Sequence, residues 1–137
     1  MAIEASPKPP RKYWIGVALS AAFVLFGLVA TLGIISRAPA ENVALLGFTP
    51  DLPFWLLLGA AILGEVIGVL GLLRRRTWAT TGFAFSVLYT VMYYMYVLHK
   101  GGWRGPLVGP AVITAVHALV LWFSIASGRR GWTHRGV

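Results

Sequence analysis

The hydrophobic and polar residues of this chain are arranged in long blocks. Four mainly apolar stretches cover residues 13–35, 54–73, 78–98 and 106–127. An α-helix needs about 20 such residues to cross a hydrocarbon core roughly 30 Å thick, whereas a lipid-facing strand would alternate apolar and polar residues. The pattern therefore predicts an all-α protein. We expect a single domain, an integral membrane four-helix bundle whose spans run antiparallel, up and down.

The composition agrees with a protein embedded in a lipid bilayer. Of the 137 residues, 58% are hydrophobic and 12% are charged, whereas soluble domains average roughly 45–50% and about 25%. The lipid bilayer is thus the first partner that we expect. Cysteine is absent, which excludes disulfides, thiolate nucleophiles and cysteine-ligated metal centres.

The positive charges predict the topology. The net charge is +8, and the basic residues lie at the ends of the apolar stretches, so we expect no nucleic-acid partner. One side of the membrane receives nine of them: Lys8, Arg11, Lys12, Arg74, Arg75, Arg76, Arg129, Arg130 and Arg135. The other side receives three: Arg37, Lys100 and Arg104. The positive-inside rule then places both termini in the cytoplasm, with basic tails at 1–12 and 128–137 near anionic lipid.

The connections between the spans differ in length. Residues 74–77 alone join the second and third spans, and so short a turn forces these two helices to pack antiparallel. The longest connection, residues 36–53, contains the apolar run 43–48. We interpret this run as either a short interfacial helix or a contact for a partner.

Two ionisable residues lie inside the predicted spans, where each costs roughly 2.5–3.5 kcal/mol on insertion scales. Glu65 is 11 residues beyond Phe54, and His117 is 11 residues beyond Pro106, in spans of the same direction. At 1.5 Å per residue both lie about 16 Å from the outer edge. Burial favours the uncharged forms of a carboxyl group and an imidazole unless they pair, so both can change protonation near neutral pH.

Hydroxyl groups on two neighbouring spans reach the same depth. The third span carries Ser86, Tyr89 and Tyr93 at helical spacing, and the fourth carries Thr114 one turn before His117. Together with Glu65 these side chains predict a polar seam that binds a small polar solute or passes a proton. The alternative is a set of hydrogen bonds that only holds the helices together.

Metal and haem chemistry is not expected. His99 and His134 lie at opposite ends of the predicted bundle, each about 15 Å or more along the membrane normal from His117. One Glu and one His are too few ligands for a specific zinc or di-iron site. We predict no metal, no cofactor and no catalytic residue, and we do not expect an enzyme.

Small residues mark one face of the second span. Ala60, Gly64 and Gly68 follow each other at intervals of four, a spacing that lets helix backbones approach closely. The contact lies either inside the bundle or between subunits of a homodimer or a larger membrane complex.

Two segments resemble a known family. The run Gly64-Glu65-Val66-Ile67-Gly68-Val69-Leu70-Gly71-Leu72-Leu73-Arg74-Arg75-Arg76-Thr77-Trp78-Ala79 and the ending Leu121-Trp122-Phe123 with Arg129-Arg130-Gly131-Trp132 are similar to those of DoxX-like membrane proteins. The resemblance implies a four-helix bundle in a bacterial inner membrane. Some members are labelled putative sugar transporters, and some relatives are tied to quinone-linked oxidation.

The expected function follows from the seam and the resemblance together. We expect a small DoxX-like membrane protein that binds or transports a small polar or amphipathic molecule at a site centred on Glu65. A non-catalytic accessory subunit of a larger membrane complex is the main alternative, and a subunit of a quinone-linked oxidoreductase is the third.

Overall fold

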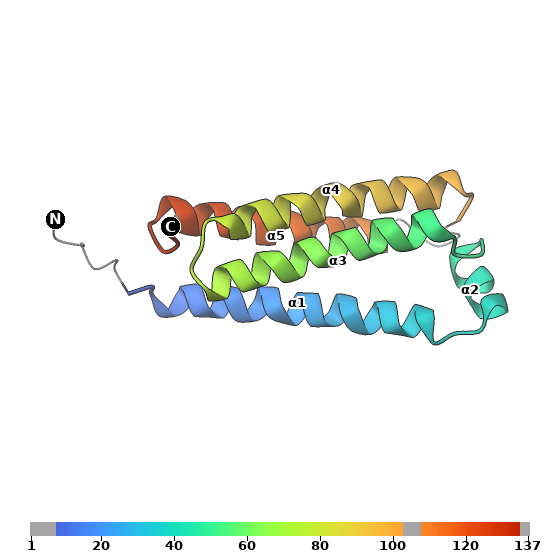
Figure 1. Cartoon of the computed structure of the whole chain (residues 1–137), viewed down its shortest axis with the longest axis horizontal. Coiled ribbons are helices and arrows are strands. Elements are labelled where there is room, and N and C mark those ends of the chain that lie inside the picture. Colours follow the sequence, from blue (N-terminus) through green and yellow to red (C-terminus); the bar gives the residue numbers. More distant parts are fainter. Residues whose placement is uncertain (1–7, 103–107, 135–137) are drawn as a thin grey trace.

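The computed structural model describes residues 8–102 and 108–134. It contains α1 (Arg11–Ile35), α2 (Pro39–Leu46), α3 (Leu52–Leu73), α4 (Trp78–His99) and α5 (Val108–Arg129), and these described residues form no strand. The four long helices run side by side along one axis, and α2 lies at one end (Figure 1). The prediction of an all-α four-helix bundle is confirmed. Each long helix is apolar enough to cross a membrane.

The predicted spans match the helices closely. The first three agree within two residues at either end, and α5 runs two residues beyond the predicted end of the fourth. The predicted start of the fourth span, Pro106, lies outside the described residues.

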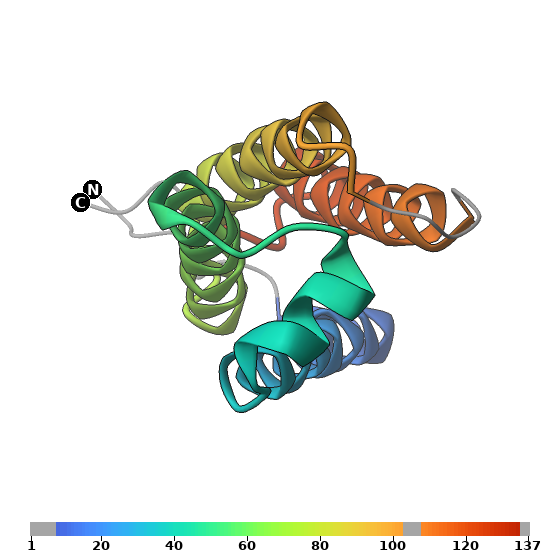
Figure 2. The same cartoon turned by 90° about the vertical axis from the view of Figure 1, so that its right-hand side faces the viewer.

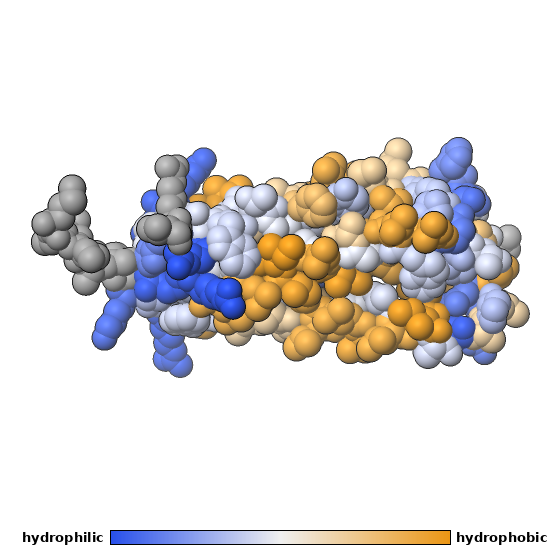
Figure 3. Space-filling view, viewed as in Figure 1, coloured by the Kyte–Doolittle hydropathy of each residue, from blue (hydrophilic) through white to orange (hydrophobic). Residues whose placement is uncertain are grey.

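Large apolar side chains cover the middle of the outer surface. Leu19 is 68% exposed, and Trp122 and Val29 are exposed to a similar extent. Figure 3 shows the apolar side chains as a belt between two hydrophilic ends. Because so much exposed apolar surface is unfavourable in water, this belt is the surface that faces the lipid.

The closest helix contact joins α3 and α4. A Cβ atom added to Gly64 would lie 2.8 Å from the carbonyl oxygen of Gly82, and one added to Gly82 would lie 2.6 Å from the backbone nitrogen of Gly68. The predicted small-residue face is therefore an internal contact at Gly64 and Gly68, whereas Ala60 is only half-buried. An interface to another subunit cannot use these two glycines while they pack against α4.

The segment between α1 and α3 forms the short helix α2, so the apolar run 43–48 is helical as far as Leu46. Pro39 starts the helix in its first turn, and Gly47 ends it with a φ of 84°, a conformation that glycine adopts without strain. Asn42 donates a hydrogen bond of 3.0 Å to the carbonyl of Ile34, and Leu46 is buried against Phe54. Viewed from this end, α2 lies across α1 (Figure 2).

The end with the arginine clusters is held together by the chain after α5. The Arg75 side chain donates to the carbonyl of Trp132 at 3.0 Å, and the His134 amide donates to the carbonyl of Arg75 at 2.7 Å. Lys12 and Arg130 both lie over the Trp132 ring. The predicted tail from residue 128 is thus packed against the α3–α4 turn as far as residue 134.

At the α2 end, Asp51 joins α3 to α4. Its side chain accepts a hydrogen bond from the amide of Phe54, which caps α3, and another from the Tyr96 hydroxyl at 2.5 Å. Lys100 lies 2.9 Å from the same carboxylate. The Tyr96 hydrogen bond, followed by that of Lys100, lowers the pKa of Asp51 to about 2.

Candidate intramembrane binding site

Glu65 occupies the middle of α3 and is 5% exposed. One apolar cluster lies toward the arginine-rich end and includes Val69 and Phe83, whereas the other lies toward α2 and includes Phe54 and Val97. The close contact between α3 and α4 also brings Ser86 next to the carboxyl group. The Ser86 hydroxyl donates to Glu65 Oε1 at 3.4 Å.

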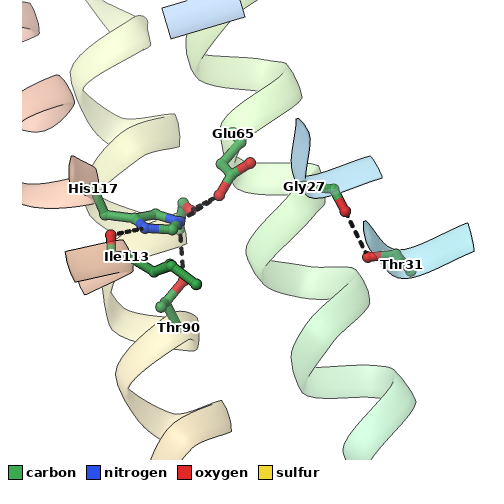
Figure 4. A network of polar contacts seen from close by, with 7 residues as sticks. Gly27, Thr31, Glu65, Thr90, Ile113 and His117 are labelled. Carbon is green, nitrogen blue, oxygen red and sulfur yellow. Dashed lines mark hydrogen bonds and ion pairs between the residues drawn. The ribbon is translucent and has the colours of Figure 1, made fainter. Parts of the chain in front are cut away.

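His117 reaches Glu65 from α5 and is equally well buried. Its Nε2 atom contacts Glu65 Oε1, and its Nδ1 atom lies 2.7 Å from the carbonyl oxygen of Ile113 (Figure 4). The Thr90 hydroxyl lies 3.3 Å from Nε2. On the remaining side, the Phe23 ring meets the imidazole edge to face, with 4.8 Å between the ring centres. The equal depths deduced from the sequence therefore correspond to a direct contact.

The hydrogen bonds define how many protons the pair holds. A carbonyl oxygen only accepts, so the contact with Ile113 requires a proton on Nδ1 of His117. The contact between Nε2 and Glu65 Oε1 then requires a second proton, carried by one of these two atoms. Both arrangements have zero net charge. One proton is thus shared between a carboxyl group and an imidazole in a site where an isolated charge is unfavourable.

The second carboxylate oxygen of Glu65 has a different environment. Within the described part of the chain no hydrogen-bond donor reaches Oε2, although this atom is buried. It points toward α1, where a methyl group added to Gly27 would lie 3.6 Å away (Figure 4). A buried oxygen without a donor is unfavourable and rare in folded proteins, so it needs an explanation.

A cavity of about 430 Å³ lies beside the pair. All five helices contribute to its wall, which includes both Glu65 and His117. The remaining wall is mainly apolar and aromatic: Phe23, Phe26, Gly27, Ala30, Thr31, Ile34, Leu45, Leu46, Leu58, Ala61, Ile62, Thr90, Tyr93, Tyr94 and Ile113. Pockets of this size and character are typical sites for small amphipathic molecules.

The structure gathers only part of the predicted seam. Ser86 contacts Glu65, and Tyr93 lines the cavity. Tyr89 does not line the cavity, and its ring packs on the exposed Phe85 with 4.4 Å between the ring centres. Thr114 is half-buried and outside the cavity wall, because Ile113 faces the cavity in its place.

Sequence reasoning overlooked several residues of this site. Thr90 lies one turn after Ser86, and the spacing 82, 86, 90, 97 gives the buried face of α4; Tyr89 lies to one side of this face. The sequence did not single out Tyr94, because it lies next to Tyr93 and only Tyr93 has the helical spacing of the predicted seam. On α1, Gly27 and Thr31 belong to a span without charged residues in its interior, so nothing in the sequence pointed to them.

Metal-ligating side chains do not cluster in the described segments. No group of three or more His, Cys, Asp and Glu residues is close enough there to hold a metal ion. What the site offers is one exchangeable proton, one free acceptor oxygen and an apolar space beside them.

No protein-family model matches this chain, and no curated protein or solved structure matches it either. The resemblance to DoxX-like proteins stays a prediction.

Proposed function

We propose that this multi-pass membrane protein binds a small amphipathic molecule in the cavity between its long helices. The apolar part of the molecule contacts the aromatic and aliphatic wall, and its polar group meets Glu65 and His117. The observation that carries this proposal is the 430 Å³ cavity into whose wall a buried carboxyl group with an unpartnered oxygen is built.

A purely structural role explains less of the arrangement. A hydrogen-bonded Glu–His pair can hold two helices together without any space beside it, and native interiors are otherwise closely packed. Here the pair borders a cavity, and one of its four hydrogen-bonding atoms has no partner among the residues that the structure describes. A bound molecule accounts for both features.

The orientation of the chain and the membrane in which it lies are part of the same proposal. The excess of Lys and Arg at one end, nine against three, supports cytoplasmic termini. The DoxX-like resemblance of residues 64–79 supports a bacterial inner membrane. Leu45 and Leu46 of α2 form part of the cavity wall, so α2 borders the binding site.

The test uses a matched pair of glycine variants on α1. A leucine at Gly27 places its side chain in the cavity next to Glu65, whereas a leucine at Gly33 meets no atom within 4 Å of its Cβ. Purified protein in detergent is heated with each of three probes that share one apolar group: phenylbutanol, phenylbutanoate and phenylbutyltrimethylammonium.

We expect at least one probe to raise the Tm of the unmodified protein and of Gly33→Leu but not that of Gly27→Leu, since binding to the folded state stabilises it. If every probe shifts the two variants equally, the cavity is not a binding site and the proposal is wrong.

A further inference from the structure

The unpartnered oxygen of Glu65 restricts the chemistry of the molecule that binds. Oε2 is a hydrogen-bond acceptor in both protonation arrangements of the pair, so it favours a group that donates or carries positive charge. Among the described residues that line the cavity, Lys and Arg are absent. A carboxylate or phosphate group would therefore meet Glu65 without a compensating cation.

The titratable groups around the cavity are few. Tyr93 and Tyr94 contribute phenol groups from α4, and His117 contributes its imidazole from α5. The cavity-lining residues of α1 and α2 include no titratable side chain. Apart from the two phenols, the Glu65–His117 pair is thus the titratable group of the described wall.

The wall also suits a positive charge in a second way. Aromatic side chains line it from two helices: Phe23 and the largely exposed Phe26 from α1, and Tyr93 and Tyr94 from α4. The face of an aromatic ring attracts cations, most strongly where water is excluded. A cation placed beside Glu65 would therefore lie between a carboxylate and aromatic rings.

From these observations, and resting on the function proposed above, we infer that the ligand is a hydrophobic organic cation that binds in exchange for the proton shared by Glu65 and His117. The exchange leaves the net charge of the site at zero. The cation enters the neutral site, the shared proton leaves to the solvent, and the filled site holds Glu65 as a carboxylate, His117 as a neutral imidazole and the bound cation.

The structure already contains hydrogen-bond donors for the state without the shared proton. Loss of this proton leaves lone pairs on His117 Nε2 and Glu65 Oε1 facing each other. The Thr90 hydroxyl, 3.3 Å from Nε2, can then donate to the imidazole, and the Ser86 hydroxyl donates to the carboxylate. Each atom that loses the shared proton thus has a hydroxyl group beside it.

The experiment measures binding of the same three probes by calorimetry between about pH 6 and about pH 8. The quaternary ammonium probe keeps its charge at every pH, so any pH dependence of its binding comes from the protein. We expect its affinity to rise about tenfold per pH unit while the pair holds its proton, with one proton released per cation bound. Phenylbutanol should bind with an affinity that does not depend on pH.

Two variants test whether cation binding depends on the carboxylate of Glu65 itself. Glu65→Gln has no carboxylate to form, so cation affinity should lose its pH dependence and fall at least tenfold more than the affinity for phenylbutanol. Glu41→Gln removes the same group from the exposed side of α2 and should leave all three affinities unchanged. Proton release is measured on the unmodified protein, so this test does not depend on how Glu65→Gln folds.

The outcomes distinguish the two proposals. If phenylbutanol or phenylbutanoate binds in a Gly27-dependent way while the cation does not bind, or binds without releasing a proton, the cation inference is overturned and the cavity remains a binding site. If Gly27→Leu and Gly33→Leu respond equally to every probe, the binding function itself fails.

Discussion

A double-mutant cycle on Glu65 and His117 measures how strongly the buried pair couples α3 to α5. Glu65→Met replaces the carboxyl group by an apolar chain of similar volume. It leaves His117 Nε2 with only the Thr90 hydroxyl at 3.3 Å. His117→Phe keeps the edge-to-face contact with Phe23 but leaves Glu65 Oε1 with only the Ser86 hydroxyl at 3.4 Å.

The expected magnitudes follow from what each substitution leaves behind. A buried polar group without its partner costs about 1–3 kcal/mol, and one that stays charged costs about 3–5 kcal/mol. We therefore expect each single variant to lose about 2–3 kcal/mol of unfolding free energy. The double variant buries neither polar group and should lose about 1 kcal/mol or less, because apolar replacements of buried ion pairs are often neutral. The coupling energy is then at least about 3 kcal/mol.

The assay is reversible unfolding in mixed detergent micelles, followed by circular dichroism. Thr80 and Ser124 serve as the control pair, because their hydroxyls lie 2.9 Å apart and join α5 to its other neighbour, α4. A cycle of Thr80→Val and Ser124→Ala should give about 0.6 kcal/mol, the average for interhelical hydrogen bonds in membranes. Additive effects of the Glu65 and His117 substitutions, within about 0.5 kcal/mol, would refute the shared-proton pair.

Three further predictions concern other parts of the molecule. Gly82→Ala should lose about 1–3 kcal/mol of unfolding free energy because α4 must move away from α3. Gly59→Ala, with open space at its Cβ, should be neutral or gain up to about 1 kcal/mol. Equal effects of the two substitutions in the same micelle assay would contradict the close contact between α3 and α4. The pKa of Asp51 is lower in the folded state than in the unfolded state, where it is about 3.9. The Asp51 carboxylate therefore stabilises the folded state when the pH is above about 3.9, and this contribution disappears as the pH falls toward about 2. The Tm difference between the unmodified protein and Asp51→Asn should thus narrow from about pH 5 to about pH 2, and a difference that is constant with pH would contradict this. Thr90→Val should weaken binding of the phenylbutyltrimethylammonium cation about 2- to 10-fold and leave binding of phenylbutanol unaffected, because one hydrogen bond contributes about 0.5–1.5 kcal/mol. An equal loss of affinity for both probes would show that Thr90 only shapes the cavity.

The sequence predicted the bundle well because membrane spans are long and uniform. About 20 apolar residues per span and arginine clusters at their ends identify the helices without knowledge of their contacts. The single carboxyl group and the single imidazole inside these spans were equally conspicuous. Their shared depth followed from the helical rise alone.

The rest of the site depends on how each helix is rotated about its own axis. For a helix in lipid, the sequence gives little information about this rotation. Apolar residues cover the outside of a membrane helix as well as its inside, so the hydrophobic pattern does not show which face is buried. Tyr89 was therefore assigned to the seam in place of Thr90, one residue further on. The cavity itself arises where Gly27 on α1 lies beside Glu65 on α3, a contact between residues far apart in the sequence.

The most direct test locates a bound probe in the bundle. Protein with labelled alanine methyl groups is saturated with phenylbutanol or with phenylbutyltrimethylammonium, and nuclear Overhauser effects from the phenyl protons of each are recorded. We predict that a bound probe gives signals to the buried Ala61 and to Ala30, which line the cavity. It should give none above the detergent background to Ala22 and Ala84, which are exposed, as Ala30 is, but lie outside the cavity wall. Equal signals at all four alanines with both probes would show that these molecules only coat the apolar surface, and the proposed binding site would be wrong.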